Sequence, residues 1–360
     1  EMLREGEIDC IIAHNVKDLI NVNDYSLPKI LVFHNCLATE IKLSKNKINR
    51  DEYLQKIEPL LDNTTKVFIS EFKKTDWNME GHIILPGLDI SEYGGYTGKN
   101  AFVLRVGNML KERDLMMGYS VSEKIAGKHP LLTLGLNPGI PDSRMSKGFD
   151  DLIMEFRNNR VYLNTTVDGY EDGYNLAMLE AMAIGMPVVS TFNKSSPIVD
   201  GVNGFCSDDP YFLNNCIELL MKDSVLAERL GRNARQTVTQ KFPISKFIES
   251  WADVIELAIK DFLINTGVNL GKEEIQFEKK AKKNILMDFV SYPATTAYYF
   301  ERALRQNHNV ITCGDMINDE VKKIWNLEAL KWEVKQQDIK RTNSCKLKGV
   351  VANLPKGWNL

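Results

Sequence analysis

Two acidic residues with the spacing of a ligand-binding pair lie in the segment "YEDGYNLAMLEAMAIGMPVVS", residues 170–190. Its apolar residues predict a buried helix followed by a buried strand, yet Glu180 stands in the middle of the helix. An ionised carboxylate in that setting is costly unless a partner binds it. Asp172 lies eight residues earlier, roughly 12 Å away along a helix at about 1.5 Å per residue. Two carboxylates so separated cannot share one proton or metal ion, but they can accept hydrogen bonds from both ends of an elongated, hydroxyl-rich ligand.

The start of this helix, which we expect over about 173–185, is a candidate phosphate site. Gly173 allows another backbone to approach closely. The N–H groups that follow it would lie at a helix N-terminus, which binds phosphate readily. A nucleotide sugar combines a hexose, a diphosphate and a ribose, which fits this arrangement of carboxylates and N–H groups. The candidate donors are those of Tyr174, Asn175 and Leu176.

Two further segments are expected beside this helix, because ligands of open α/β sheets bind outside the carboxyl ends of the strands. One is the turn "GNMLKERD" after the strand 101–107, and the other is the strand end 164–174. A lysine or an arginine of the turn could add a cation to a diphosphate, or could simply belong to a solvated face. Asp172 could likewise be only a helix N-cap. The candidate binding residues of the two segments are Gly107, Asn108, Lys111, Arg113, Thr166 and Glu171.

Composition narrows the classes of partner. The formal net charge of -3 gives no case for nucleic acid as a partner. No apolar run reaches the roughly 18 residues that span a membrane. We therefore expect no transmembrane segment, although the protein could contact a membrane peripherally. The start of the chain lacks the regions of a secretory signal, and the six cysteines show no zinc spacing. We therefore expect a cytoplasmic protein without a metal site.

Strand-like and helix-like runs alternate along the chain, which predicts parallel α/β sheets. The Gly-rich stretch 91–100 separates two such runs and is expected to be a hinge. The polar stretch 264–283 is expected to be a linker. The predicted parts are a partial acceptor-side domain over 1–97, a donor-binding domain over 98–263, the linker 264–283, and the opening βαβ of a further nucleotide fold over 284–360.

The segment "EDGYNLAMLEAMAIGMPVVS" and the later "SPIVDGVNGFCSDD" together resemble the donor-binding signature of GT-B glycosyltransferases of the large retaining group often called family 4. The resemblance covers about 100–265. It implies a GT-B fold, with two Rossmann-like parallel-sheet domains facing a cleft, the first of them incomplete or completed by the C-terminal segment. It also implies that Glu180 binds the ribose of a nucleotide and that Asp172, or the adjacent Glu171, binds sugar hydroxyls. Asp172 and Asn108 stand where the family often has Glu and Arg.

The same resemblance implies that 1–97 is the second half of an acceptor domain. His34 then stands near the place where such enzymes put a histidine facing the sugar, although a lone histidine at a strand end could equally be structural. Gly94, Gly95 and Tyr96 are expected to line the cleft.

The segment 284–360 has two explanations. It could supply the first strands that 1–97 lacks, as in a circular permutation. Alternatively it opens a second module, since it resembles the start of spore-maturation-type glycosyltransferase modules. The ragged ends of the chain favour the second explanation, and even then the segment could dock on the open sheet edge, which invites strand addition.

The resemblance implies an enzyme that moves a hexose from a nucleotide-diphosphate sugar to a glycan, lipid or protein acceptor, with retention and without a metal or other cofactor. The catalytic candidates are Asp172, Glu180 and His34. One alternative is a non-catalytic GT-B module that binds nucleotide or glycan within a larger glycosylation protein. Another is a nucleotide-sugar epimerase of the same fold.

Overall fold

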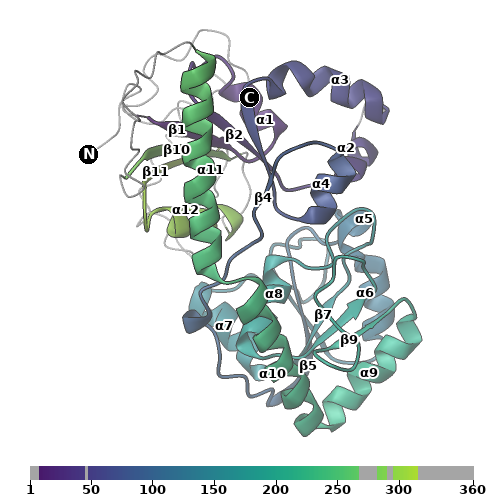
Figure 1. The fold of residues 1–360 in the computed structure, drawn as a ribbon. Helices are drawn as coiled ribbons and strands as arrows, with labels where there is room; N and C mark the ends of the chain where they lie inside the picture. The colour runs from purple at the N-terminus through teal and green to yellow at the C-terminus, as the bar shows by residue number, and fades with distance from the viewer. Residues whose placement is uncertain (1–7, 45–47, 267–281, 290–294, 315–360) are drawn as a thin grey trace. The chain divides into compact units, whose positions relative to one another are not determined.

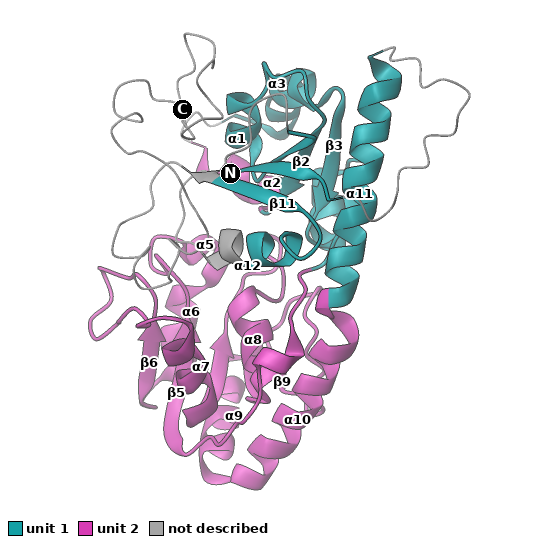
Figure 2. Ribbon diagram, turned by 90° about the vertical axis from the view of Figure 1, so that its left-hand side faces the viewer, with its two compact units in different colours: residues 1–34, 46–85, 245–360 teal, residues 35–45, 86–244 magenta. Residues whose placement is uncertain are grey.

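The computed structural model describes residues 8–44, 48–266, 282–289 and 295–314. The chain forms two compact units, shown in two colours in Figure 2. Unit 1 comprises residues 1–34, 46–85 and 245–360, and unit 2 comprises residues 35–45 and 86–244. Each unit is built around one parallel sheet flanked by helices (Figure 1). The predicted fold class, α/β with two Rossmann-like parallel sheets, is therefore confirmed.

The sheet of unit 1 has the strand order β11-β10-β1-β2-β3-β4, and every neighbouring pair is parallel. Its central strands are almost wholly apolar, as expected for strands covered on both faces. The strands are β1 (Cys10–Ala13), β2 (Lys29–Phe33), β3 (Thr64–Phe68), β4 (His82–Ile83), β10 (Asn284–Phe289) and β11 (Asn309–Gly314). The helices are α1 (Val16–Asn21), α3 (Arg50–Leu61), α4 (Glu71–Trp77), α11 (Ile244–Asn265) and α12 (Thr295–Leu304), and α2 (Leu37–Leu43) is grouped with unit 2.

The strand beside β1 comes from the far end of the chain. Cys10 to Ala13 pair in register with 285–288 of β10. The Asp9 N–H donates to the Asn284 carbonyl at 2.8 Å, and the Asn284 N–H donates to Asp9 Oδ2 at 2.7 Å. The described part of 284–360 thus extends the sheet begun by β1. Both origins considered for this segment, permutation and a further module, stay predictions, and residues 315–360 lie outside the described part of the chain.

Helix α12 is joined to the core of unit 1 through aromatic contacts. The Phe300 ring lies edge-on to those of Phe247 and Trp251 on α11, with centroids 5.2 and 5.5 Å apart. The neighbouring Glu301 is fully buried and accepts hydrogen bonds from Arg305 Nε at 2.6 Å and from Thr312 Oγ1 at 3.0 Å. These bonds offset the cost of burying its carboxylate. The β10–α12–β11 segment therefore shares one core with the rest of unit 1.

The sheet of unit 2 has the order β6-β5-β7-β8-β9 and is also parallel throughout. The long amphipathic run 211–242 predicts a helix that breaks near Asp223. The structure confirms the break, because Asp223 ends one helix and caps the next by accepting from the Leu226 N–H at 2.8 Å. The strands are β5 (Asn100–Val106), β6 (Leu131–Leu134), β7 (Asn159–Asn164), β8 (Val188–Thr191) and β9 (Phe205–Ser207). The helices are α5 (Asp114–Met117), α6 (Tyr119–Ala126), α7 (Phe149–Asn158), α8 (Leu176–Ile184), α9 (Pro210–Lys222) and α10 (Ser224–Lys241).

The sequence after the strand 101–107 predicts a glycine turn followed by one helix that reaches about residue 122. The structure instead has two short helices, α5 and α6. They meet at Gly118, whose φ is 58°. A Cβ at this position would lie 2.2 Å from the carbonyl oxygen of Thr165. The chain therefore turns at Gly118 because only glycine allows both this backbone conformation and this approach to the end of β7.

The stretch predicted as a hinge, 91–100, is bonded to the elements of unit 2. Arg157 Nε donates to the Gly94 carbonyl at 2.6 Å, and the Tyr96 hydroxyl donates to the Arg160 carbonyl at 2.7 Å. Gly95 lies against the Arg157 side chain. By its contacts this stretch is grouped with unit 2, and its role as a hinge stays a prediction. Within the described residues, no helix is both long enough and apolar enough to cross a membrane.

Candidate functional site

Glu180 is buried in α8, as its apolar neighbours predicted. Every residue of this helix from Met178 to Ile184 is buried, and Glu180 is only 4% exposed. The hydroxyl of Tyr93 donates to Glu180 Oε1 at 3.2 Å. Burial, and after it the charge of Glu180, raises the pKa of the neighbouring Tyr162. The carboxylate is therefore held inside unit 2 by a residue from a distant part of the sequence.

The start of α8 differs from the prediction. Asn175 is the N-cap, with φ −138° and ψ 171°, and its side chain accepts from the Met178 N–H at 2.9 Å. A short side chain with an acceptor atom favours a helix start at this position. It accepts from a backbone N–H of the first turn that has no carbonyl partner within the helix. Tyr174 and Asn175 consequently precede the helix, so their N–H groups are not those of its first turn. Asp172 is therefore not the N-cap. The separation of roughly 12 Å between Asp172 and Glu180 does not apply either, because it assumed a helix at about 1.5 Å per residue starting at Asp172.

Gly173 does allow the close backbone approach that we predicted. A Cβ there would lie 2.4 Å from the backbone nitrogen of Ser196. The Gly173 N–H donates to Ser195 Oγ at 2.8 Å, and Asn193 Nδ2 donates to the Glu171 carbonyl at 3.0 Å. The loop before α8 is therefore fixed to the loop that follows β8. Sequence reasoning missed the contribution of this second loop.

Glu171 and Asp172 both lie inside the fold, at 8% and 1% exposure. The Asp172 N–H donates to Glu171 Oε1 at 2.9 Å. The two carboxylates thus occupy the buried loop immediately before α8, in the same unit as Glu180.

A buried polar network joins the carboxyl ends of β7 and β8. Asn164 Nδ2 donates to Thr166 Oγ1 at 3.1 Å and to Ser190 Oγ at 3.2 Å. Asn175 Nδ2 in turn donates to Asn164 Oδ1 at 3.2 Å. Sequence reasoning selected Thr166 and Asn175 but missed Asn164 and Ser190. Polar residues at the ends of otherwise apolar strands were the signal that could have found them.

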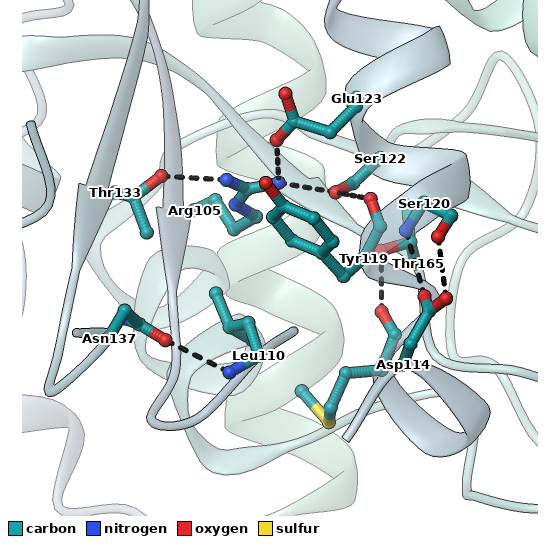
Figure 3. Close-up of polar contacts among 11 residues, drawn as sticks. Arg105, Leu110, Asp114, Tyr119, Ser120, Ser122, Glu123, Thr133, Asn137 and Thr165 are labelled. Atoms are coloured by element: carbon teal, nitrogen blue, oxygen red, sulfur yellow. Dashed lines mark hydrogen bonds and ion pairs between the residues drawn. The ribbon is translucent and has the colours of Figure 1, made fainter. Parts of the chain in front are cut away.

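The turn after β5 is closed by side-chain amides. Asn137 Oδ1 accepts from the Leu110 N–H at 2.9 Å, and its Nδ2 donates to the Gly107 carbonyl at 2.8 Å; Figure 3 shows the first of these bonds. Asn108 Oδ1 accepts from the Leu136 N–H at 2.8 Å. Asn108 therefore ties this turn to the end of β6.

Lys111 and Arg113 are exposed on the same turn, and Arg113 directly precedes α5. The corner between α5 and α6 is held by Asp114, which accepts from the Ser120 N–H at 2.8 Å (Figure 3). A fixed turn that presents two exposed cations can bind an anion or can remain a solvated face. Their contact with a diphosphate stays a prediction.

Arg105 is a buried cation that sequence reasoning did not select. Its Nη1 donates to Glu123 Oε1 at 2.8 Å and also to Ser122, and its Nη2 donates to Thr133 Oγ1 at 2.9 Å (Figure 3). The guanidinium carbon lies 4.9 Å from the centre of the Tyr119 ring, within the range of a cation–π contact. Arg105 therefore joins β5 to β6 and α6.

His34 lies in unit 1, at the end of β2, and is paired with a second histidine. His14 Nδ1 and His34 Nε2 are 2.8 Å apart, so one ring donates and the other accepts. Burial, and then the charge of Lys73, lowers the pKa of His34 to about 3. Burial and His34 lower the pKa of His14 well below its usual range. The pair is neutral at pH 7, and the catalytic role of His34 stays a prediction.

Two comparisons of the sequence find glycosyltransferases. Residues 120–223 match the family described as glycosyl transferases group 1. The chain is 28% identical over 132 residues to the capsular polysaccharide biosynthesis glycosyltransferase CapM of Staphylococcus aureus, a match that covers 36% of this chain and 33% of CapM.

The structure also resembles solved glycosyltransferase structures. The crystal structure of TarM superposes with a TM-score of 0.53 at 18% identity, over 68% of this chain and 54% of TarM. Anabaena HepE, in complex with UDP and glucose, superposes with a TM-score of 0.54 at 16% identity, over 69% of this chain and 77% of HepE. The chain thus spans a third of CapM and about half of TarM. At these identities the structural likeness shows the fold: this chain has the GT-B fold, and residues 120–223 of its unit 2 match the group 1 glycosyltransferases.

Proposed function

We propose that this protein is a glycosyltransferase that takes a sugar from a nucleotide-diphosphate donor. The observation that carries the proposal is the buried Glu180 in α8, within the stretch 120–223 that matches the group 1 family. An acidic side chain inside an apolar helix is maintained at a cost. Binding the ribose of a nucleotide gives that carboxylate a function.

The neighbouring groups supply the other parts of a donor site. Asp172, or the adjacent Glu171, binds hydroxyls of the sugar. The N–H of Leu176 at the start of α8 and the side chains of Lys111 and Arg113 face the diphosphate, because helix N-termini and cations both favour anions. Stabilising the departing diphosphate in this way is an electrostatic device that lowers the barrier to transfer.

We further propose a hexose as the transferred group, retention at the anomeric carbon, and transfer without a metal ion. The diphosphate itself can accept the proton of the attacking hydroxyl, so the mechanism requires no protein base. The acceptor is a glycan, a lipid or a protein. The name of CapM, a polysaccharide biosynthesis enzyme, favours a glycan.

Nucleotide binding tests the proposal. UDP and GDP, and then UDP-glucose, UDP-GlcNAc and GDP-mannose, are titrated by calorimetry into the wild type, Glu180→Gln and Glu218→Gln. Glu218 is an exposed residue on α9 that pairs with Lys222, which makes it a control for the loss of one carboxylate. We expect micromolar binding that falls at least about tenfold in Glu180→Gln only, since hydrogen bonds to charged groups contribute about 1.5–3 kcal/mol. Failure of every nucleotide to bind the folded wild type would contradict the proposal.

A non-catalytic GT-B module is the second candidate. It is favoured by Asn108, which stands where the resembling family often has a cation and whose side chain instead bonds the end of β6. Donor hydrolysis separates the two candidates, because an active transferase usually transfers some sugar to water. Tight nucleotide binding with no release of sugar over hours, and with no product in an acceptor screen, would favour the module.

A further inference from the structure

We propose that Tyr93 is a positioning residue for the nucleotide, and that its hydroxyl fixes the Glu180 carboxylate in the orientation that the ribose hydroxyls require. The inference rests on the proposed function. It adds a residue 87 positions away from Glu180 in the sequence, which precedes β5 and belongs neither to α8 nor to the loops that follow β5, β7 and β8.

The contact is built inside the protein. Tyr93 and Glu180 are 5% and 4% exposed, and the hydroxyl and Oε1 are 3.2 Å apart. The Tyr93 ring lies edge-on to that of Phe149, with centroids 6.1 Å apart, so the ring is held independently of its hydroxyl. In surroundings of low dielectric constant, a hydrogen bond to an ionised carboxylate is stronger than in water. An ionised carboxylate offers about four acceptor sites, so the bond from Tyr93 does not exhaust its capacity for ligand hydroxyls.

The segment that carries Tyr93 is attached to α8 at a second point. Tyr93 directly follows a 3₁₀-helix, Ile90–Glu92. Arg235 on α10 donates from Nη2 to the Ile90 carbonyl at 3.1 Å and from Nη1 to the Ala183 carbonyl on α8. The segment is therefore bound to α8 through Arg235 and through the Tyr93–Glu180 bond. The position of the Glu180 carboxylate consequently depends on this segment as well as on its own helix.

The Tyr93–Glu180 contact predicts which groups of the ligand contribute less to affinity when the Tyr93 hydroxyl is removed. A carboxylate in one fixed orientation can accept from both hydroxyls of a ribose, whereas one that rotates satisfies them less well. Loss of the Tyr93 hydroxyl should therefore reduce the contribution of the ribose hydroxyls, while contacts to the base and the diphosphate are kept. A merely structural tyrosine would instead affect all nucleotides alike.

The test is Tyr93→Phe, which keeps the ring and its contact with Phe149. The dissociation constants of UDP, 2′-deoxy-UDP and 3′-deoxy-UDP are measured by calorimetry, or those of the guanosine series if GDP is the better ligand. The control is Tyr211→Phe, which removes the hydroxyl of an 83% exposed tyrosine on α9. Thermal melts of all variants show that they are folded.

We expect the wild type and Tyr211→Phe to prefer UDP over its deoxy forms. In Tyr93→Phe we expect the affinity for UDP to fall about tenfold, and the affinities for the deoxy forms to change little, so that the preference shrinks by the same factor. Equal losses for all three ligands, or an unchanged preference in a folded Tyr93→Phe, would overturn the inference while leaving the proposed function intact. Absence of nucleotide binding in the wild type would overturn both.

Discussion

At the scale of single residues, His14 and His34 make the stability of unit 1 depend on pH. Burial lowers the pKa of both rings, that of His34 to about 3, whereas the unfolded chain has a histidine pKa of about 6.5. The unfolded state therefore binds more protons below about pH 6.5. The stability that the neutral pair contributes is fully present above this pH and is lost progressively as the pH falls toward 3.

Thermal melts between pH 8 and pH 5 test this dependence. We expect the melting temperature of the wild type to fall as the pH drops below about 6.5, and the fall to be smaller in His14→Gln, which removes one of the two buried bases. His129→Gln, at a partly exposed position just after α6, should keep the slope of the wild type. If the melting temperature depended on pH in the same way in all three proteins, the histidine pair would not gain protons on unfolding.

Two glycines with similar backbone angles should differ sharply on substitution. Gly118→Ala would place a Cβ 2.2 Å from the Thr165 carbonyl at a φ of 58°, whereas Gly201→Ala at a φ of 69° meets nothing within 4 Å. The left-handed conformation alone costs roughly 1–2 kcal/mol for a non-glycine residue. We expect Gly201→Ala to lose about that much free energy of unfolding and Gly118→Ala to lose clearly more. Urea denaturation followed by fluorescence measures both.

Some features of single residues were predictable from their neighbours alone. Glu180 lies among apolar residues in every direction of a helix, so its burial followed from the local sequence. Gly173 was predicted to allow a close approach because glycine has no Cβ. The partner of Glu180 was not predictable, because Tyr93 lies 87 positions away and its segment shows no periodicity that would place it. The start of α8 was misplaced because Gly173 and Asn175 are both common near helix starts.

At the scale of elements, we expect α12 to be essential for the stability of unit 1, because its Phe300 ring is buried in the core. Phe300 is 7% exposed and contacts Phe247 and Trp251 on α11 and both rings of the histidine pair. Truncation of a buried Phe to Ala costs about 3–5 kcal/mol. We expect Phe300→Ala to lower the free energy of unfolding of unit 1 by that amount. Phe212→Ala removes a ring at a 40% exposed position on α9, in unit 2. It should change the free energy of unfolding of unit 2 by less than about 0.5 kcal/mol.

Chemical denaturation of the two variants provides the measurement. An effect of Phe300→Ala no larger than that of Phe212→Ala would mean that the β10–α12–β11 segment does not share the core of unit 1.

Element boundaries were predictable where a local residue sets them. The break between α9 and α10 was predicted near Asp223, and the structure gives its local cause, since Asp is a strong N-cap. The break at Gly118 was missed because its cause, the carbonyl of Thr165, is a tertiary contact. The place of β10 beside β1 could not be decided from the sequence, because any parallel strand with the same apolar pattern would satisfy the open edge.

At the scale of the whole molecule, two compact units should respond separately to a ligand of one of them. The proposed donor site lies in unit 2, so a nucleotide should stabilise that unit by RT ln(1 + [L]/Kd), about 2.7 kcal/mol at a hundredfold excess over Kd. In scanning calorimetry we expect UDP or GDP to raise the melting temperature of unit 2. Glu180→Gln should reduce the stabilisation to about half at the same ligand concentration, since a tenfold weaker Kd leaves only a tenfold excess. Phe300→Ala identifies the unfolding transition of unit 1, because it lowers that transition. If a nucleotide raised only this transition, the site would lie in unit 1.

The pairing of β1 with β10 has a consequence for the newly made chain. Asp9 and Asn284 are 275 residues apart, and ribosomes add roughly 5–20 residues per second. The strand β10, which pairs with one edge of β1, is therefore made tens of seconds after β1. By then unit 2, which ends at residue 244, is already complete and can fold. During this interval β1 presents a bare, apolar edge of the kind that pairs with other chains. Because this pairing joins strands that are far apart in the sequence, the sheet of unit 1 is expected to fold slowly.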